Sequence, residues 1–346
     1  MASNKLSMKN IIIICLIIIL LTIISIPVSA FWGSADLTFS QVVKVFKFKL
    51  NPVKYPLEEK CLLSIVWELR LPRILLAIAV GSGLAMCGAT MQALTRNVMA
   101  EPYTLGVASG ASVMAALSIV FLGDNVTLYF FTPSVAAFIG AILAMFLVYS
   151  ISSSENGASN IKLILTGIAI SMICSALTQL IISLAPKESK VRSVVFWTMG
   201  GFGGARWGNI LFPILVATIG GIILYSHSET LNLLAMGNDT AIMLGVSVEK
   251  IQKRLIVIIS LITGTMVAAA GCIGFIGLII PHIVRHFVGA DHRKMLPITM
   301  LLGGLFMIWT DAIARWILSP RELAIGVLTA LMGGPFFLTL LRKNRG

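Results

Sequence analysis

Charged side chains are scarce in this sequence, in which lysine, arginine, aspartate and glutamate together make up 12% of 346 residues. Soluble domains carry roughly 25%. Hydrophobic residues account for 58% of the chain, and the mean hydropathy is +0.97. This composition excludes an ordinary soluble enzyme or binding domain and indicates an all-α polytopic membrane protein.

Motifs of the common catalytic and cofactor sites are also missing. The sequence has no GxxxxGKS/T phosphate loop, no GxSxG and no HExxH. Its five cysteines include no CxxC pair, and none stands at ligand spacing from His282 and His286. We therefore predict a chain that is not an enzyme, that holds no metal and no cofactor, and that has no nucleic-acid partner. Any ATP would bind to partner subunits.

Apolar segments of nearly membrane-spanning length recur along the chain, since a spanning helix needs about 20 mostly apolar residues. The first also resembles a signal peptide. We interpret it as an uncleaved helix, because both termini carry the lysine and arginine expected of cytoplasmic ends. The chain is then a single transmembrane domain, 1–346, with an outer loop at 32–69. The ten segments are 10–31, 72–93, 105–122, 132–150, 162–184, 208–226, 255–271, 273–288, 296–317 and 323–341.

Positive charge is divided evenly in this topology, with half of the 26 lysines and arginines on each side of the membrane. Cytoplasmic loops ordinarily carry the excess. The outer half includes Arg70 and Arg73, at the mouth of the second segment. So basic an outer surface predicts an acidic partner on that side. In the alternative interpretation, the long outer loop escapes the charge rule and its lysines are simply solvated.

Glycine is concentrated in the apolar segments, where small residues let helices approach closely. The run GCIGFIGLIIPHIVRHF differs, because Gly271, Gly274, Gly277 and Pro281 weaken a helix that is already short. A broken helix persists at membrane depth only where protein or a water-filled cavity satisfies its backbone. We predict that it lies along a transport pathway.

One acidic residue, Asp311, lies inside the ninth segment, where an ionised carboxylate costs about 2.5–3.5 kcal/mol on insertion scales. Arg315 follows four residues later on the same helix face and can neutralise it. We interpret this pair as an intramembrane tether, since a proton relay would need more buried acids.

The inner loop 227–254 is built unlike a random linker. A short helix is predicted at Thr240–Leu244, preceded by Gly237 and closed by Gly245. Its apolar residues would be exposed unless something covers them. We predict a docking helix for a cytoplasmic partner, with the alternative that it folds onto the chain's own helices.

Five stretches, in order along the chain, resemble the FecCD family of permeases. These are the membrane subunits of type II ABC importers for iron-siderophore complexes, haem and vitamin B12. The resemblance implies ten helices, a second permease subunit, two cytoplasmic ATPases and an extracytoplasmic binding protein. The stretches are LRLPRILLAIAVGSGLAMCGATMQALTRNVMAEPYTLGVASGAS (69–112), MGGFGGARW (199–207), LNLLAMGNDTAIMLGVSV (231–248), GCIGFIGLIIPHIVRHFVGADHRKMLP (271–297) and DAIARWILSPRELAIGVLTALMGGPFFLTLL (311–341).

The resemblance also implies roles for particular residues. Arg70, Arg73 and Arg315 match arginines that meet acidic residues of the binding protein. Asn97 and Met99 match the constricting positions of a cytoplasmic gate. Residues 231–248 match the coupling segment that sits in a cleft of the ATPase, and we assign to this contact Met236, Gly237, Asp239, Ala241, Leu244 and Gly245.

The sequence departs from the family pattern in two places. Val98 replaces the proline that usually follows the gate asparagine, which predicts a looser turn because the fixed φ of proline is lost. Ala324 replaces a proline before the tenth helix, which leaves the start of that helix open.

We expect a permease that moves an iron chelate, a siderophore or haem, across the cytoplasmic membrane by alternating access. Vitamin B12 is the alternative cargo, because the run GGFGG resembles vitamin B12 permeases. A secondary transporter driven by an ion gradient is a rival class, against which the scarcity of intramembrane carboxylates argues. A structural subunit without a pathway would leave the broken helix and the gate-like loop without purpose.

Overall fold

The computed structural model describes residues 7–33, 37–51, 60–122, 132–154, 157–158 and 160–343. This part of the chain is helical except for turns, loops and one antiparallel pair, β1 (Ser153–Ser154) and β2 (Gly157–Ala158). The all-α prediction is therefore confirmed.

Each predicted membrane segment contains a helix. In the described ranges, seven helices are long and apolar enough to cross a membrane, and Val107–Leu122, Ile276–Val288 and Ile325–Thr339 are shorter apolar helices. The segments correspond to α1 (Met8–Phe31), α4 (Leu71–Thr95), α5 (Val107–Leu117) with η3 (Ser118–Leu122), α6 (Pro133–Ser152), α7 (Asn160–Ser183), α9 (Trp207–Ser226), α12 (Val248–Ala270), α13 (Ile276–Val288), α14 (His292–Trp316) and α15 (Ile325–Lys343).

Several short helices lie in segments that we had interpreted as loops. The predicted outer loop 32–69 holds α2, and from Cys61 onward it is helical and continuous with α4. Because Glu68 and Arg70 are charged and interrupt the apolar pattern, we predicted too late a start for this membrane segment, at residue 72. The additional helices are α2 (Phe39–Leu50), α3 (Lys60–Leu63), η1 (Ser64–Arg70), η2 (Pro102–Leu105), α8 (Glu188–Met199) and α10 (Ser228–Met236). α11 (Asn238–Met243) overlaps the short helix that we predicted at Thr240–Leu244.

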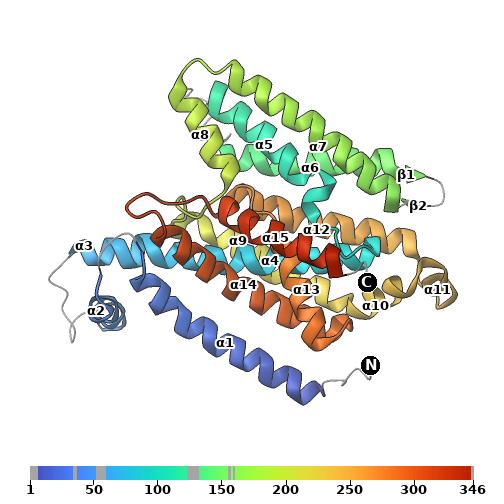
Figure 1. The fold of residues 1–346 in the computed structure, drawn as a ribbon, viewed down its shortest axis with the longest axis horizontal. Coiled ribbons are helices and arrows are strands. Elements are labelled where there is room, and N and C mark those ends of the chain that lie inside the picture. The colour runs from blue at the N-terminus through green and yellow to red at the C-terminus, as the bar shows by residue number, and fades with distance from the viewer. Residues whose placement is uncertain are drawn as a thin grey trace.

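The two ends of the molecule differ in what they carry (Figure 1). α2, α3 and α8 lie at one end, and α10 and α11 lie at the other, where α1 begins and α15 ends. α2 is seen end-on in this view and crosses the direction of α1. We call the end built from the predicted outer segments the outer end, and the end built from the predicted inner loop the inner end.

The central helix of the bundle is α4, which packs against α1, α9, α12, α13 and α14. Glycine allows this close packing. Gly81 lies against the backbone of Gly303 in α14, and Gly88 lies against the backbone of Gly277 in α13. A side chain at either contact would meet backbone atoms, which cannot move aside. This close packing matters because lipid offers helices no hydrophobic reason to associate.

We predict that Gly88→Ala destabilises the protein by about 1–3 kcal/mol, because the new methyl group must push α13 away from α4. The matched control is Gly208→Ala in α9, where no atom lies within 4 Å of the added Cβ. Thermal unfolding of the detergent-purified variants measures the difference. Equal unfolding temperatures for the two variants would refute the close-packing argument.

Candidate functional site

At the outer end of the bundle, a buried carboxylate binds two arginines. Asp311 in α14 is fully buried. Its Oδ1 accepts a hydrogen bond from Arg73 Nε at 2.8 Å, and its Oδ2 accepts one from Arg315 Nε at 3.0 Å. Arg73 also pairs with Glu322, whose Oε2 lies 2.7 Å from its NH1. The predicted tether between Asp311 and Arg315 is confirmed, and Arg73 joins it from α4.

Arg315 also reaches the end of α1, together with Arg70, at a place where the last carbonyl groups of a helix lack partners. Arg70 NH1 donates to the carbonyls of Ala30 at 2.6 Å and Phe31 at 3.0 Å. Arg315 NH1 donates to the Trp32 carbonyl at 2.7 Å, and its NH2 donates to the carbonyl of Ser29 at 3.0 Å. These cations cap α1 and complement the negative end of its dipole.

These side chains line a pocket of about 390 Å³. Arg70, Arg73 and Arg315 are buried, with 6%, 8% and 3% of their surface exposed. Arg206 lines the same pocket from an exposed position before α9. We had not singled out Arg206 or Glu322 as site residues, although both stand within stretches that carried the resemblance. The docking role of the three predicted arginines stays a prediction.

The predicted gate residues form a closed turn after α4. Arg96 ends the helix with a left-handed φ of 51°. The side-chain oxygen of Asn97 accepts a hydrogen bond from Met99 N at 2.9 Å, and its carbonyl accepts one from Ala100 N at 3.1 Å. The turn thus closes with Val98 in the place of proline, because Asn97 supplies the bonds that hold it.

Between α12 and α13 the chain is non-helical at residues 271–275, where the glycines weaken the helix. Gly271 has a φ of 70° and packs against the backbone at the end of α8. The ring of Tyr103 lies beside Gly274, since a Cβ atom added at Gly274 would be 3.7 Å from it. Two amide groups of this segment find partners across the bundle: Ile273 N donates to Tyr103 Oη at 3.1 Å, and Phe275 N donates to Glu101 Oε2 at 3.2 Å.

Pro281 does not interrupt the helix, contrary to our prediction, since α13 continues to Val288. The missing amide of Pro281 frees the carbonyl of Gly277, four residues earlier. Gln92 in α4 binds this carbonyl through Nε2 at 3.1 Å, and its Oε1 accepts a hydrogen bond from Arg285 at 2.9 Å. A neighbouring helix therefore compensates for the proline.

At the inner end, α10 and α11 form the predicted coupling segment as two helices, where we had expected one. Gly237, with a φ of 126°, separates them, and Gly245, with a φ of 84°, follows α11. The structure places Met236 and Leu244 at the surface, 69% and 60% exposed, together with Asp239 in the first turn of α11. Ala241 is buried, so its side chain packs inside the chain.

A hydrogen-bonded link fastens α10 to the start of α14. Asn232 Nδ2 donates to Asp291 Oδ1 at 2.8 Å, and Asn232 Oδ1 accepts a hydrogen bond from His292 N at 2.8 Å. Burial raises the pKa of Asp291, but hydrogen bonds from Arg293 and Asn232 outweigh it and lower the pKa to about 2. This carboxylate therefore stays ionised at physiological pH, and its contribution to stability is lost as the pH falls from its ordinary pKa of 3.8 through about 2.

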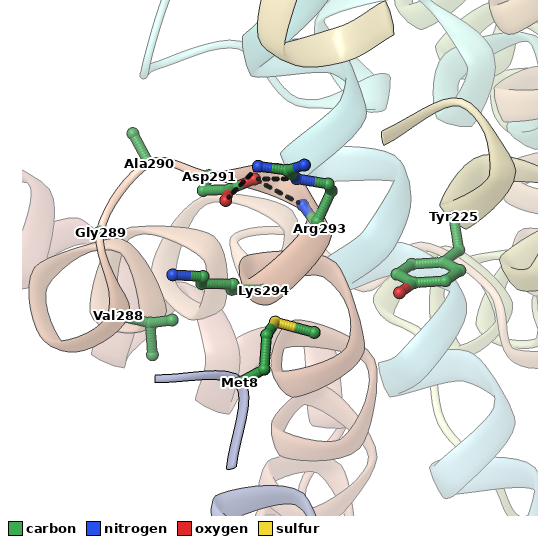
Figure 2. Close-up of a pocket in the computed structure, with 8 residues that line it drawn as sticks. All are labelled: Met8, Tyr225, Val288, Gly289, Ala290, Asp291, Arg293 and Lys294. Atoms are coloured by element: carbon green, nitrogen blue, oxygen red, sulfur yellow. Dashed lines mark hydrogen bonds and ion pairs between the residues drawn. The ribbon is translucent and has the colours of Figure 1, made fainter. Parts of the chain in front are cut away.

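Figure 2 shows Asp291 and Arg293 joined in this turn, beside a cavity of about 640 Å³. Met8 at the start of α1 and Tyr225 near the end of α9 line the same cavity. The turn from α13 to α14 is thus in contact with the coupling segment and lies beside the inner ends of two further helices.

Known proteins resemble the chain over most of its length. The model of the FecCD transport family matches residues 17–343. A cobalamin import system permease of Halobacterium salinarum is 39% identical over 280 residues, which are 81% of this chain and 74% of that protein. An Fe(3+)-citrate import system permease of Bacillus subtilis is 38% identical over 283 residues, which are 81% of this chain and 82% of that protein. An inward-facing structure of a metal-chelate type ABC transporter superposes with a TM-score of 0.81 at 34% identity, covering 95% of this chain and 99% of that chain.

The fold and these matches define a multi-pass membrane permease of the ABC importer class. The chain belongs to the FecCD transport family. It is the non-catalytic membrane subunit, and ATP hydrolysis takes place on separate ATPase subunits.

We predict that Asp311→Asn lowers the free energy of unfolding by about 3–5 kcal/mol, because two buried guanidinium groups lose their shared negative charge. Glu188→Gln is the matched control: its partner Arg192 lies 3.8 Å away and both side chains are exposed, so no measurable change is expected. Chemical denaturation in detergent measures both. An Asp311→Asn variant as stable as Glu188→Gln would mean that the cluster does not hold the outer end together.

Proposed function

We propose that this permease moves an iron chelate, a siderophore or haem, into the cytoplasm by alternating access. It works with a second permease subunit, two cytoplasmic ATPases and an extracytoplasmic binding protein, in the cytoplasmic membrane and with both termini in the cytoplasm. The observation that supports this most strongly is that a break at membrane depth, a gate-like turn and an exposed inner segment are joined by hydrogen bonds within one chain.

A polar stripe on α7 supports a pathway shared with a second subunit. Ser171, Ser175, Gln179 and Ser183 follow one another at intervals of four residues, which places them on one face of the helix. Ser175, Gln179 and Ser183 are exposed, and α7 lies at the edge of the molecule (Figure 1). Polar side chains are unfavourable against lipid, so this face fits a wet boundary with another permease subunit.

The inner end fits an ATPase that covers apolar surface. Met243 is 86% exposed and Ile242 is 59% exposed in α11, next to Met236 and Leu244. Exposed methionine and leucine beyond the membrane mark a surface for a protein partner. Because Asn232 in α10 is bonded to Asp291, a displacement of this segment reaches α13 and α14 directly.

The outer end fits an acidic binding protein. The pocket contains Arg70, Arg73, Arg206 and Arg315, and among the residues that the structure describes the acids paired with them are Glu322 and the nearby Asp311. An acidic side chain entering the pocket would meet the exposed Arg206 first. Complementary charge of this kind raises the rate of encounter more than the affinity.

Iron chelates are the cargo we favour, because an Fe(3+)-citrate permease and a metal-chelate transporter structure are among the proteins that this chain resembles. Cobalamin is the second candidate, since a cobalamin permease is equally similar at 39% identity. Asp311 is bound by two arginines and Glu101 accepts the amide of Phe275, so both carboxylates are already engaged within the chain, which argues against a secondary transporter driven by protons.

We predict that proteoliposomes containing the permease, its ATPases and its binding protein accumulate radiolabelled iron supplied as a ferric chelate, and that accumulation requires ATP. Cyanocobalamin supplied in parallel distinguishes the two cargoes. Accumulation of cobalamin alone would replace the proposed cargo. Iron uptake that follows an imposed ion gradient without ATP would overturn the mechanism.

We predict that Arg206→Glu slows association of the binding protein several-fold at low salt, because it reverses the charge at the exposed edge of the pocket. Arg192→Glu is the control, since it makes the same charge change at an exposed position in α8 that does not line the pocket. Association rates measured by biolayer interferometry on nanodisc-held permease test this. Equal rates for the two variants would remove the pocket from the docking surface.

A further inference from the structure

The residue that starts α13 has an unusual backbone conformation. Phe275 has a φ of 69°, in the left-handed region, and it is one of two residues other than glycine with positive φ in the part of the chain that the structure describes. Such a conformation costs a bulky residue about 1–3 kcal/mol, and it persists only where its surroundings hold it.

Two side chains at the start of η2, Glu101 and Tyr103, hold this segment. Glu101 Oε2 accepts the amide of Phe275 at 3.2 Å, and Tyr103 Oη accepts the amide of Ile273 at 3.1 Å. Both acceptors follow the gate turn directly in sequence. Because lipid supplies no hydrogen bonds, these amides would otherwise be left unpaired at membrane depth.

Charge and shape favour the same arrangement. The carboxylate of Glu101 lies at the N-terminus of α13, where the helix dipole favours negative charge. The ring of Phe275 packs on Gly333 of α15, where any added side chain would collide with it. Phe275 is therefore held by its amide on one side and by its ring on the other.

The far end of α13 reaches the coupling segment. α13 ends at Val288, and three residues later Asp291 binds Asn232 of α10. A helix of 13 residues is about 20 Å long at 1.5 Å per residue. It therefore spans the distance from the coupling segment to the segment that follows the gate turn.

We propose that Glu101 and Tyr103 are positioning residues that fasten the gate turn to the N-terminus of α13, so that movement of the coupling segment is transmitted through α13 to the gate. This inference rests on the proposed ATP-driven function. The role of Glu101 is to accept one hydrogen bond, so glutamine satisfies it and alanine does not.

The test compares uptake and ATP hydrolysis in the reconstituted importer for wild type, Glu101→Gln, Glu101→Ala and Tyr103→Phe. We expect Glu101→Ala to keep ATP hydrolysis but to lower the cargo transported per ATP at least tenfold. Tyr103→Phe, which keeps the ring and loses the hydroxyl, should lower it less, and Glu101→Gln should match wild type. Glu188→Ala, at an exposed acid of α8, is the control for loss of a carboxylate.

A general loss of folding would lower uptake and ATP hydrolysis together and leave their ratio unchanged. Uncoupling would lower the ratio of cargo transported to ATP hydrolysed. Should Glu101→Ala fail to fold, the double variant Glu101→Ala/Phe275→Gly carries the same test, because glycine adopts a left-handed conformation without strain. A transport-to-hydrolysis ratio in the alanine variants equal to that of wild type would overturn the proposal.

Hydrogen–deuterium exchange of the permease alone separates this inference from the proposed function. Amides at 273–276 should exchange at least tenfold faster in Glu101→Ala than in Glu101→Gln. If wild type shows no ATP-dependent uptake, the proposed function fails whatever the exchange result. If exchange at these amides is the same in both variants, the hydrogen bond does not hold α13, and the inference fails even where uptake is normal.

Discussion

A membrane offers no water to a backbone amide or carbonyl that lacks a partner, and this constraint organises the whole chain. At three places where a helix ends, contains a proline or breaks inside the bundle, side chains from distant segments supply the missing bond. Arg70 and Arg315 serve the end of α1, Gln92 serves the carbonyl freed by Pro281, and Glu101 and Tyr103 serve the break before α13. Each of these bonds also fixes the position of one helix relative to another.

The buried charges are tolerated for the same reason. A lone carboxylate in α14 would be costly, but Asp311 shares its two oxygens between Arg73 and Arg315, and both arginines have further acceptors. The arginines therefore act first within the chain, as links between α1, α4 and α14. The arginines outnumber Asp311 and Glu322, so the outer pocket keeps a net positive charge. The predicted contact with a binding protein would use this charge, with Arg206 at the exposed edge.

Two helices, α13 and α14, link the inner end of the bundle to the break and to the outer end. α14 runs from the link with Asn232 at the inner end to Asp311 at the outer end, and α13 runs from that link to the break. Small residues let both helices lie directly on α4. In the proposed mechanism, a displacement of α10 would therefore reach the gate turn and the outer pocket through α13 and α14, as an importer driven from the cytoplasm requires.

The sequence alone was enough to predict the membrane helices and the pairing of Asp311 with Arg315, because both depend on residues close together in the chain. The short helices α2, α8 and α10 were not predicted, because their mixed composition resembles that of polar loops. Pro281 was misread as a break because its compensation comes from Gln92, which binds the carbonyl of Gly277 from 185 residues away. The contacts of Arg73 with Glu322 and of Glu101 with Phe275 join segments 249 and 174 residues apart, which no local pattern reveals.

In the proposed mechanism, the gate turn changes its exposure when the ATPases bind nucleotide. A cysteine at Met99, in a chain whose exposed Cys61 is replaced with serine, would report this through its rate of reaction with a water-soluble thiol reagent in inside-out vesicles holding the whole importer. We expect rates that differ at least tenfold between the nucleotide-free and the ATP-bound state. Equal rates in the two states, in vesicles that still accumulate cargo, would contradict it.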